Sequence, residues 1–203
     1  EASVEVTGGA TENPKLVGAG DSDIGFTNAN LAYAAYSGTG IFEGSAYGDL
    51  RLMFGGVAPG TIHMVVKADS DIQTYADLKG RKVAVGPQGG GGLSLLPDLF
   101  KIYDMTMDDI KASYMSYVEA AFAQAPHPAS AIKNIQGSGV AFRLIEMTEE
   151  ERTQLLTDCP YYNSVDIPAD VYGTDHDIKT IGSSNVVVIN AGLSEDLVYQ
   201  MVK

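Results

Sequence analysis

Residues 83–100 constrain the fold most strongly, because they read as a short apolar strand, a run of glycines and the start of a helix. The glycines, Gly89, Gly90, Gly91 and Gly92, permit positive φ angles and let the backbone come close to a ligand, since no Cβ stands in the way. Pro97 is tolerated only in the first turn of a helix, so the helix is expected to begin near residue 93. Free amides and the helix dipole would then form an anion site.

Turn geometry alone explains such a glycine run equally well, and named nucleotide motifs do not fit it. A P-loop ends in Gly-Lys-Ser/Thr, whereas Leu93 and Ser94 follow Gly92 here. The dinucleotide pattern fails too, because no third glycine follows at the required spacing. The loop therefore indicates a small anionic group rather than a nucleotide.

Composition narrows the class of protein. The 203 residues allow one large domain or two small lobes, and 45% hydrophobic with 19% charged residues is typical of a globular protein. The net charge of −13 argues against nucleic acid or an anionic membrane surface as partner, and no apolar run reaches the roughly 20 residues of a spanning helix. Cys159 has no disulfide partner, and His63, His127 and His176 lack metal-ligand spacing. We predict no metal and no cofactor.

Strands alternating with capped helices predict an α/β fold whose sheets are largely parallel and flanked by helices. Strands are expected at residues 1–6, 23–26, 50–57, 61–66, 83–85, 113–116, 140–145 and 185–190. Helices are expected from residues 14, 31, 74, 93, 129, 148 and 194 onward. Residues 161–162 and 167–172 read as loops with exposed aromatic side chains.

One stretch gives conflicting signals. Ser116 and Glu119 have the spacing of a capping box, which predicts a helix, but the prolines at 126 and 128 stop it after a few residues. We take the conflict as a sign that residues are missing from the chain near 122–124.

Asparagines stand at two junctions between a strand and a helix. Gly9 and Ala10 belong to a turn that leads to Asn13, while Asn28 and Asn30 precede an alanine-rich helix. Open α/β sheets bind ligands at such junctions. N-capping of the helices is the alternative explanation.

Seven short motifs, in order and over nearly the whole chain, resemble the TAXI family of solute receptors that serve TRAP transporters. They are Thr-Gly-Gly-Ala-Thr-Glu-Asn from residue 7, Asn-Ala-Asn-Leu-Ala-Tyr from 28, His-Met-Val-Val-Lys-Ala-Asp-Ser from 63, Ala-Asp-Leu-Lys-Gly from 76, Val-Gly-Pro-Gln-Gly from 85, Ala-Pro-His-Pro from 125 with Ile-Pro at 167 and Tyr172, and Glu-Asp-Leu-Val-Tyr from 195.

The resemblance implies a two-lobed periplasmic binding protein of type II, joined by hinge strands, with residues 1–64 and 188–203 in lobe I and 65–187 in lobe II. It implies a periplasmic receptor, exported by a signal peptide that this sequence does not include, without direct membrane insertion. The receptor would capture a small carboxylate, such as glutamate, another amino acid or a dicarboxylate, in the interlobe cleft. It would present this ligand to the membrane subunits of a TRAP transporter.

The predicted site combines three kinds of group. Backbone amides at Gly89, Gly90, Gly91 and Gly92 would bind the carboxylate. The side chains of Asn13, Asn28 and Asn30 would meet polar groups beside the turn at Gly9 and Ala10. Tyr117 and Tyr172 are candidate walls, although simple packing explains each tyrosine better.

The sequence departs from the TAXI pattern at the ligand-binding positions. The family loop usually continues Gly-Ser-Gly-Thr, so two hydroxyls are absent here, and Ala10 replaces a serine. A hydrogen bond to a charged group contributes about 1.5–3 kcal/mol, so these losses would change affinity or ligand identity. The family's first strand, its Gly-Gly-Thr-Tyr turn and its last helices have no counterpart here, and we expect the chain to be part of a longer protein.

Two other functions stay open. An enzyme on a similar two-lobed fold, for example a transferase, would use the glycine loop for a phosphate group, although the chain lacks a Gly-x-Ser-x-Gly elbow and a Cys/His motif. An effector-sensing domain would need an attached DNA-binding segment. We predict a binding protein that is not an enzyme.

Overall fold

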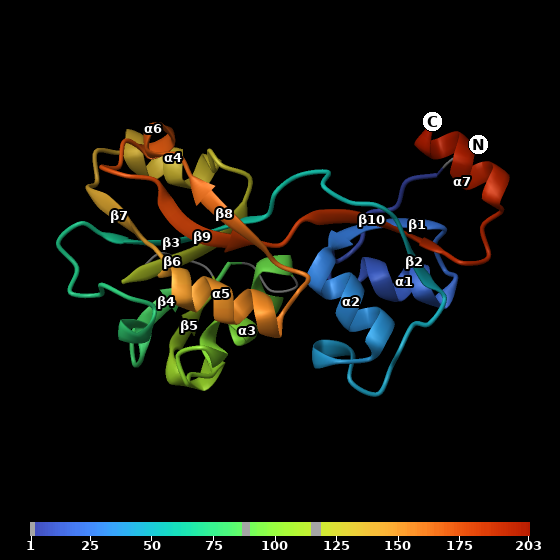
Figure 1. Cartoon of the computed structure of the whole chain (residues 1–203), viewed down its shortest axis with the longest axis horizontal. Coiled ribbons are helices and arrows are strands. Elements are labelled where there is room, and N and C mark those ends of the chain that lie inside the picture. The colour runs from blue at the N-terminus through green and yellow to red at the C-terminus, as the bar shows by residue number, and fades with distance from the viewer. Residues whose placement is uncertain (1–2, 87–89, 115–118) are drawn as a thin grey trace. The chain divides into compact units, whose positions relative to one another are not determined.

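The structure is a computed structural model that describes residues 3–86, 90–114 and 119–203 (Figure 1). Internal packing divides it into two units. The first unit holds the chain up to Ala58, Gly90, Gly91 and residues 184–203, and the second holds residues 59–86 and 92–183 without the gap. The division leaves β3 whole in the second unit and β10 whole in the first, whereas the predicted boundaries at 64 and 188 cut through both strands.

The first unit is a three-stranded antiparallel sheet in the order β1-β10-β2, with helices packed against it (Figure 1). Val186 and Val188 of the central strand point to the face that packs on Val17, Leu31 and Ala35 of the helices. Its elements are α1 (Asn13–Ala19), β1 (Ile24–Asn28), α2 (Ala29–Ser37), the 3-10 turn η1 (Gly40–Phe42), β2 (Leu50–Phe54), β10 (Asn185–Asn190) and α7 (Glu195–Val202).

The second unit is built on a seven-stranded sheet in the order β5-β4-β6-β3-β9-β8, with β7 paired to β3. Its elements are β3 (Thr61–Lys67), η2 (Ala76–Leu78), β4 (Lys82–Ala84), η3 (Gly91–Ser94), α3 (Leu96–Lys101), η4 (Met107–Asp109), β5 (Lys111–Ser113), β6 (Ala120–Ala125), α4 (Ser130–Gly137), β7 (Phe142–Ile145), α5 (Glu149–Asp158), β8 (Asn163–Ile167), α6 (Ala169–Tyr172) and β9 (Ile178–Gly182). The first residue of η3, Gly91, belongs to the first unit.

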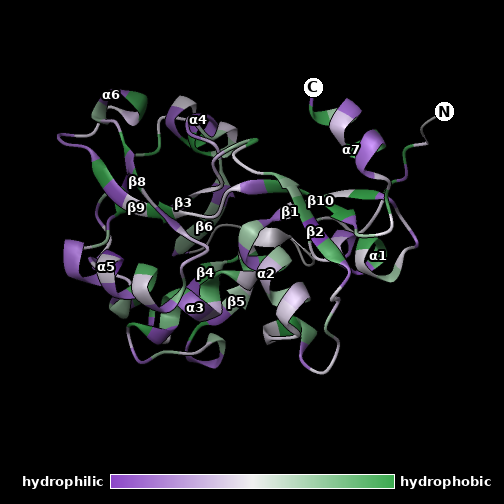
Figure 2. Ribbon diagram, turned by 45° about the vertical axis from the view of Figure 1, so that its right-hand side comes forward, coloured by the Kyte–Doolittle hydropathy of each residue, from purple (hydrophilic) through white to green (hydrophobic). Residues whose placement is uncertain are grey.

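Strand β3 is the centre of the second unit because both of its faces are buried. Its even positions, such as Met64, join the larger apolar cluster with α3 and α5, and Val65 joins a smaller cluster with α4 and α6. Helix α5 covers the larger cluster and is hydrophilic along most of its length (Figure 2). This helix begins with the predicted capping box, in which Glu151 N donates to Thr148 Oγ1.

The mixed α/β class is confirmed, but the predicted strand direction is wrong. Among the described residues only the pairs of β4 with β5 and of β4 with β6 are parallel, and six pairs are antiparallel. Capped helices between strands do not determine direction, because β3 and β10 each meet strands that come from distant parts of the sequence.

Three local predictions are also wrong. Residues 3–7 form no strand, and Val4 and Val6 stay exposed. Residues 120–125 form β6 instead of a helix, because they pair with β3 from Ala120 opposite Val66 to Ala125 opposite Thr61. Because residues 120–125 are a strand, no helix is cut short there, and the conflict that suggested missing residues near 122–124 disappears. Residues 161–162 lie outside helices and strands as predicted, but Ile167 is the last residue of β8 and residues 169–172 form the short helix α6. Tyr162 and Tyr172 are buried, not exposed.

Candidate functional site

The first unit brings together Asn28, Asn185, Ala10 and Gly91, here called the Asn28 cluster. Asn28 ends β1 and stands directly before α2, with an extended backbone and no side-chain cap. Its register partner on β10 is Asn185, and Asn28 Nδ2 donates to Asn185 Oδ1 over 2.9 Å. The side chain of Asn28 is therefore held by β10 and does not cap the helix that it precedes.

Gly91 lies against Asn28 in a space that admits no side chain. A Cβ at Gly91 would overlap Asn28 Oδ1, and would lie 3.0 Å from Asn28 Cγ and 3.4 Å from the Cβ of Ala10. Ala10 is fixed in turn because its carbonyl oxygen accepts a hydrogen bond of 2.6 Å from Thr27 Oγ1. The backbone at Gly91 thus comes close to the side chain of Asn28, and its predicted approach to a ligand stays a prediction.

The amide of Asn28 has a defined orientation. Its Nδ2 donates to Asn185, so the atom directed toward Gly91 is the carbonyl oxygen Oδ1. Asn28 is only 6% exposed, and a buried amide seldom leaves its partners. The cluster therefore directs an acceptor toward Gly91, whereas the sequence alone did not say which end of the Asn28 amide would face the loop.

The other predicted residues of the first unit have structural partners. Gly9 has a φ of 94°, and its carbonyl oxygen accepts from the amides of Glu12 and Asn13. Asn13 Nδ2 donates to the carbonyl of Phe26 over 2.6 Å, and its Oδ1 accepts from Thr7. Asn30 is buried in the first turn of α2 and Gly90 is half-buried. Asn13 thus ties the turn to β1, and its role as a ligand group stays a prediction.

The predicted residues of the second unit have different surroundings. A Cβ at Gly92 would come within 2.8 Å of Phe122 Cε1 and 3.3 Å of Gln124 Cβ. Tyr172 is buried, its hydroxyl accepts from the amide of Ala129 over 2.6 Å, and burial raises its pKa. Gly89 and Tyr117 lie outside the described residues. Gly92 and Tyr172 belong to the second unit and are not members of the Asn28 cluster.

Sequence reasoning missed Asn185. This residue begins an apolar run that reads only as a buried strand, and its partnership with Asn28 depends on a register that joins residues 157 positions apart. The sequence does contain one signal, because Asn185 stands at the first position of an apolar strand just as Asn28 stands at the last position of another. Over the described ranges, no group of three or more His, Cys, Asp or Glu side chains could hold a metal ion.

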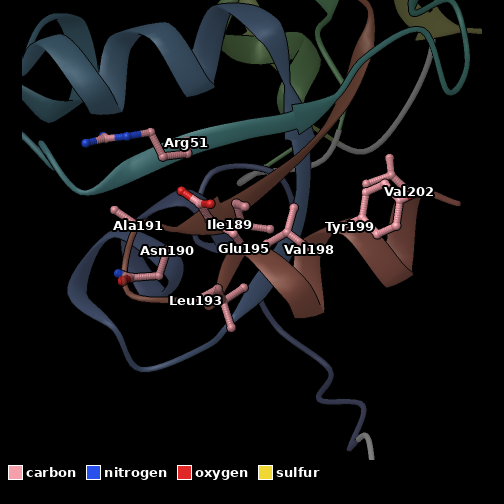
Figure 3. Close-up of a pocket in the computed structure, with 9 residues that line it drawn as sticks. All are labelled: Arg51, Ile189, Asn190, Ala191, Leu193, Glu195, Val198, Tyr199 and Val202. Atoms are coloured by element: carbon pink, nitrogen blue, oxygen red, sulfur yellow. The ribbon is translucent and has the colours of Figure 1, made fainter.

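A hollow of the first unit lies between α7 and strands β2 and β10 (Figure 3). It is an open groove of about 500 Å³, with apolar walls from residues such as Ile189 and Val198. The side chain of Asn190, which lines the groove, already has two hydrogen-bond partners: its Nδ2 donates to Val17 O and its Oδ1 accepts from Gly192 N. The groove contains no residue of the Asn28 cluster, and we assign no ligand to it.

Comparisons with known proteins place this geometry in a family and a fold. The sequence pattern of the NMT1-like family matches residues 1–203. Protein XAC2383 of Xanthomonas citri, bound to chloride, is 11% identical with a TM-score of 0.53, over 93% of this chain and 64% of that one. The glutathione import system of Streptococcus mutans, GshT with the cystine ABC importer TcyBC, matches at 13% identity and a TM-score of 0.50, over 98% and 68%.

The periplasmic aliphatic sulphonate-binding protein SsuA of Escherichia coli is 17% identical over 97% of this chain, with a TM-score of 0.45. This chain covers 57% of the length of SsuA. The likenesses to XAC2383 and to the GshT structure show the fold alone, a mixed α/β fold with sheets flanked by helices. No helix in the part of the chain that the structure describes is long and apolar enough to cross a membrane.

Proposed function

Because the chain belongs to the NMT1-like family, we propose that it is an extracytoplasmic solute-binding receptor that delivers a small ligand to a membrane transporter. The observation that supports a binding role best is the contact of Gly91 with Asn28, where backbone comes so close that no side chain fits. Such an approach is typical of loops that bring backbone groups to a ligand. The receptor would do no chemistry on its ligand.

The ligand class follows from the polarity of the groups in the Asn28 cluster. Backbone amides of the glycine loop donate hydrogen bonds and suit a carboxylate, while Oδ1 of Asn28 accepts and suits an N–H donor. A ligand with both groups on one carbon is an amino acid. We therefore favour an amino acid such as glutamate over a dicarboxylate, which would offer no donor to Asn28.

The receptor could serve one of two types of transporter, and we propose a TRAP transporter. The motif resemblance to TAXI receptors favours a TRAP transporter. The Streptococcus mutans neighbour is described with an ABC importer instead. Co-purification of this protein with the membrane subunits of a TRAP transporter or of an ABC importer would decide between the two types.

A thermal-shift screen of the purified chain against amino acids, dicarboxylates and phosphate compounds tests the receptor function. A ligand at 100 times its dissociation constant adds about 2.7 kcal/mol of stability. Glutamate and glutarate form the sharpest pair, because they differ only in the ammonium group. We expect glutamate to bind about 10-fold or more tightly, since a hydrogen bond to a charged group contributes about 1.5–3 kcal/mol.

Three other results would change the proposal. Equal affinity for glutamate and glutarate would remove the acceptor role of Asn28. A shift with phosphate compounds alone, followed by turnover, would favour the transferase. No shift with any carboxylate would contradict the proposed ligand class.

A further inference from the structure

A buried chain of hydrogen bonds in the second unit joins three elements through one histidine. His63 lies on β3, is 1% exposed, and its Nε2 is 3.1 Å from the hydroxyl of Tyr172 on α6. The same hydroxyl receives the N–H of Ala129, directly before α4, at 2.6 Å. The Nδ1 of His63 is 3.1 Å from the carbonyl oxygen of Thr61. One imidazole therefore connects α4 and α6 to the central strand.

The partners determine where the protons lie. The amide of Ala129 can only donate, so the Tyr172 oxygen accepts there and its own proton is free to point to His63. Nε2 of His63 is then the acceptor, and the ring proton is on Nδ1, which donates to the Thr61 carbonyl. His63 is neutral in this arrangement, and Thr61 and Tyr172 are partners of the correct polarity for Nδ1 and Nε2. The backbone of Ala123 also interacts with the ring.

A proton on Nε2 would break this arrangement. Nε2–H would face the Tyr172 hydroxyl, whose oxygen already accepts from Ala129 and whose proton would lose its acceptor. A buried charge and an orphaned polar group are both costly. Protonated His63 therefore favours a state in which Tyr172 has moved away.

No counter-ion compensates for the charge. Among the residues that the structure describes, no carboxylate lies within 4 Å of His63, and the nearby ionisable groups are His127, at 3.0 Å from Thr61 Oγ1, and Lys133, whose Nζ lies over the Tyr172 ring. Other charged side chains on the elements packed around His63 have partners of their own or are exposed. Arg143 donates to the carbonyl oxygens of Ser70 and Ile72, and Asp166 and Lys179 form ion pairs with Arg152 and Glu149. Asp170 lies at the surface.

We propose that the His63–Tyr172 contact is a pH-sensitive clamp, in which proton uptake by His63 releases α6 and the start of α4 from β3. Two of the other printed hydrogen bonds of α6 join it to α4, which is released with it: Lys133 Nζ and Gln136 Nε2 donate to the carbonyl oxygens of Val171 and Tyr172. The apolar cluster on this face of β3 has seven buried members, against 22 on the opposite face. Opening is therefore local to α4 and α6. The burial of His63 disfavours its protonated form in the closed state and lowers its pKa to about 4.

Hydrogen exchange of the Ala129 amide between pH 7.5 and 4.5, corrected for intrinsic rates, tests the clamp. Because opening takes up one proton, protection at Ala129 should fall about tenfold per pH unit below pH 6.5. The buried Val83, on β4 of the same unit, should stay better protected than Ala129 throughout this range, because it exchanges only when the whole unit unfolds. Equal protection at both amides would mean that Ala129 also exchanges by global unfolding and would overturn the proposal.

Variants separate the clamp from other causes. His63→Gln should flatten the pH dependence at Ala129, while His127→Gln should leave the slope unchanged. Tyr172→Phe, which keeps the ring, should leave Ala129 poorly protected at every pH. Nitrogen-15 spectra of wild-type His63 should show the Nδ1–H tautomer at neutral pH. An Nε2–H tautomer, or an unchanged slope in His63→Gln, would contradict the assignment.

Discussion

The two units differ in how completely they bury their apolar side chains. The second unit has apolar clusters of 22 and seven buried residues on opposite faces of β3. The first unit has one cluster of seven, on one face of its sheet. Of the 16 large apolar side chains that stay exposed among described residues, 14 belong to the first unit, including Phe26 and Leu52.

This difference indicates which unit is more stable and which unit contains the proposed ligand site. A sheet covered on both faces resists local opening, whereas a one-sided sheet opens at lower cost. Binding regions are commonly drawn from the less stable part of a protein. The Asn28 cluster lies in the first unit, so we expect that unit to unfold first and to gain most from a ligand.

The largest effect should come from truncating each core. Phe100→Ala removes a fully buried ring of the second unit and should cost about 3–5 kcal/mol, through lost burial and the cavity left behind. Phe42→Ala in the first unit should cost less, because its smaller cluster can collapse more easily. Calorimetry should show two transitions, with Phe100→Ala lowering only the upper one. A single transition lowered by both variants would contradict the comparison.

Acid should weaken the second unit, because the buried His63 lies there. The pKa of His63 falls from 6.5 to about 4 on folding, so the unfolded chain takes up the proton first. The contribution of His63 is complete above pH 6.5 and is lost as the pH falls to 4. The loss is about 3 kcal/mol at 1.36 kcal/mol per pKa unit. Urea unfolding at pH 7 and 4.5 measures it, with His63→Gln as control.

Gly91→Ala tests the tight contact in the first unit. The new Cβ would force Asn28 off Asn185, and an unsatisfied buried amide costs about 1–3 kcal/mol. The lower transition and ligand affinity should both fall. Gly48→Ala in the same unit is the matched control, because no atom lies within 4 Å of its Cβ position, and it should change stability by less than about 0.5 kcal/mol. Equal effects would show that position 91 is not crowded.

Helix caps should give the smallest effects and should again differ between the units. Thr148→Ala removes the cap of α5, which packs on the larger cluster, and should cost about 1 kcal/mol. Ser194→Ala removes the cap of α7, which has no buried residue, and should leave both transitions in place. A loss of similar size from Ser194→Ala would show that α7 supports the first unit more than its burial suggests.

Local chemistry predicted most of the elements. The capping box at Thr148, the glycine after α1 and the apolar runs at 61–66 and 185–190 each lie where the sequence placed them. These signals depend on neighbours within four residues or on a short apolar pattern, which a single sequence contains.

Pairing between distant segments could not be predicted in the same way. Residues 120–125 are rich in alanine, which favours helix, yet β3 and β4 hold them as a strand. Gly91 and Asn28 were both expected at the site from local patterns. Asn185 was not, because only the register of β1 with β10 brings it to Asn28, where it fixes which end of the Asn28 amide faces Gly91.

Chemical-shift mapping during a titration with glutamate tests the central claim most directly. The receptor proposal predicts saturable shifts at the Gly91 backbone amide and the Asn28 side-chain amide, which weaken in Gly91→Ala and persist in Gly48→Ala. Saturable binding that leaves Gly91 and Asn28 unshifted, with residues of the α7 groove such as Tyr199 shifted instead, would contradict the claim that the Asn28 cluster is the ligand site.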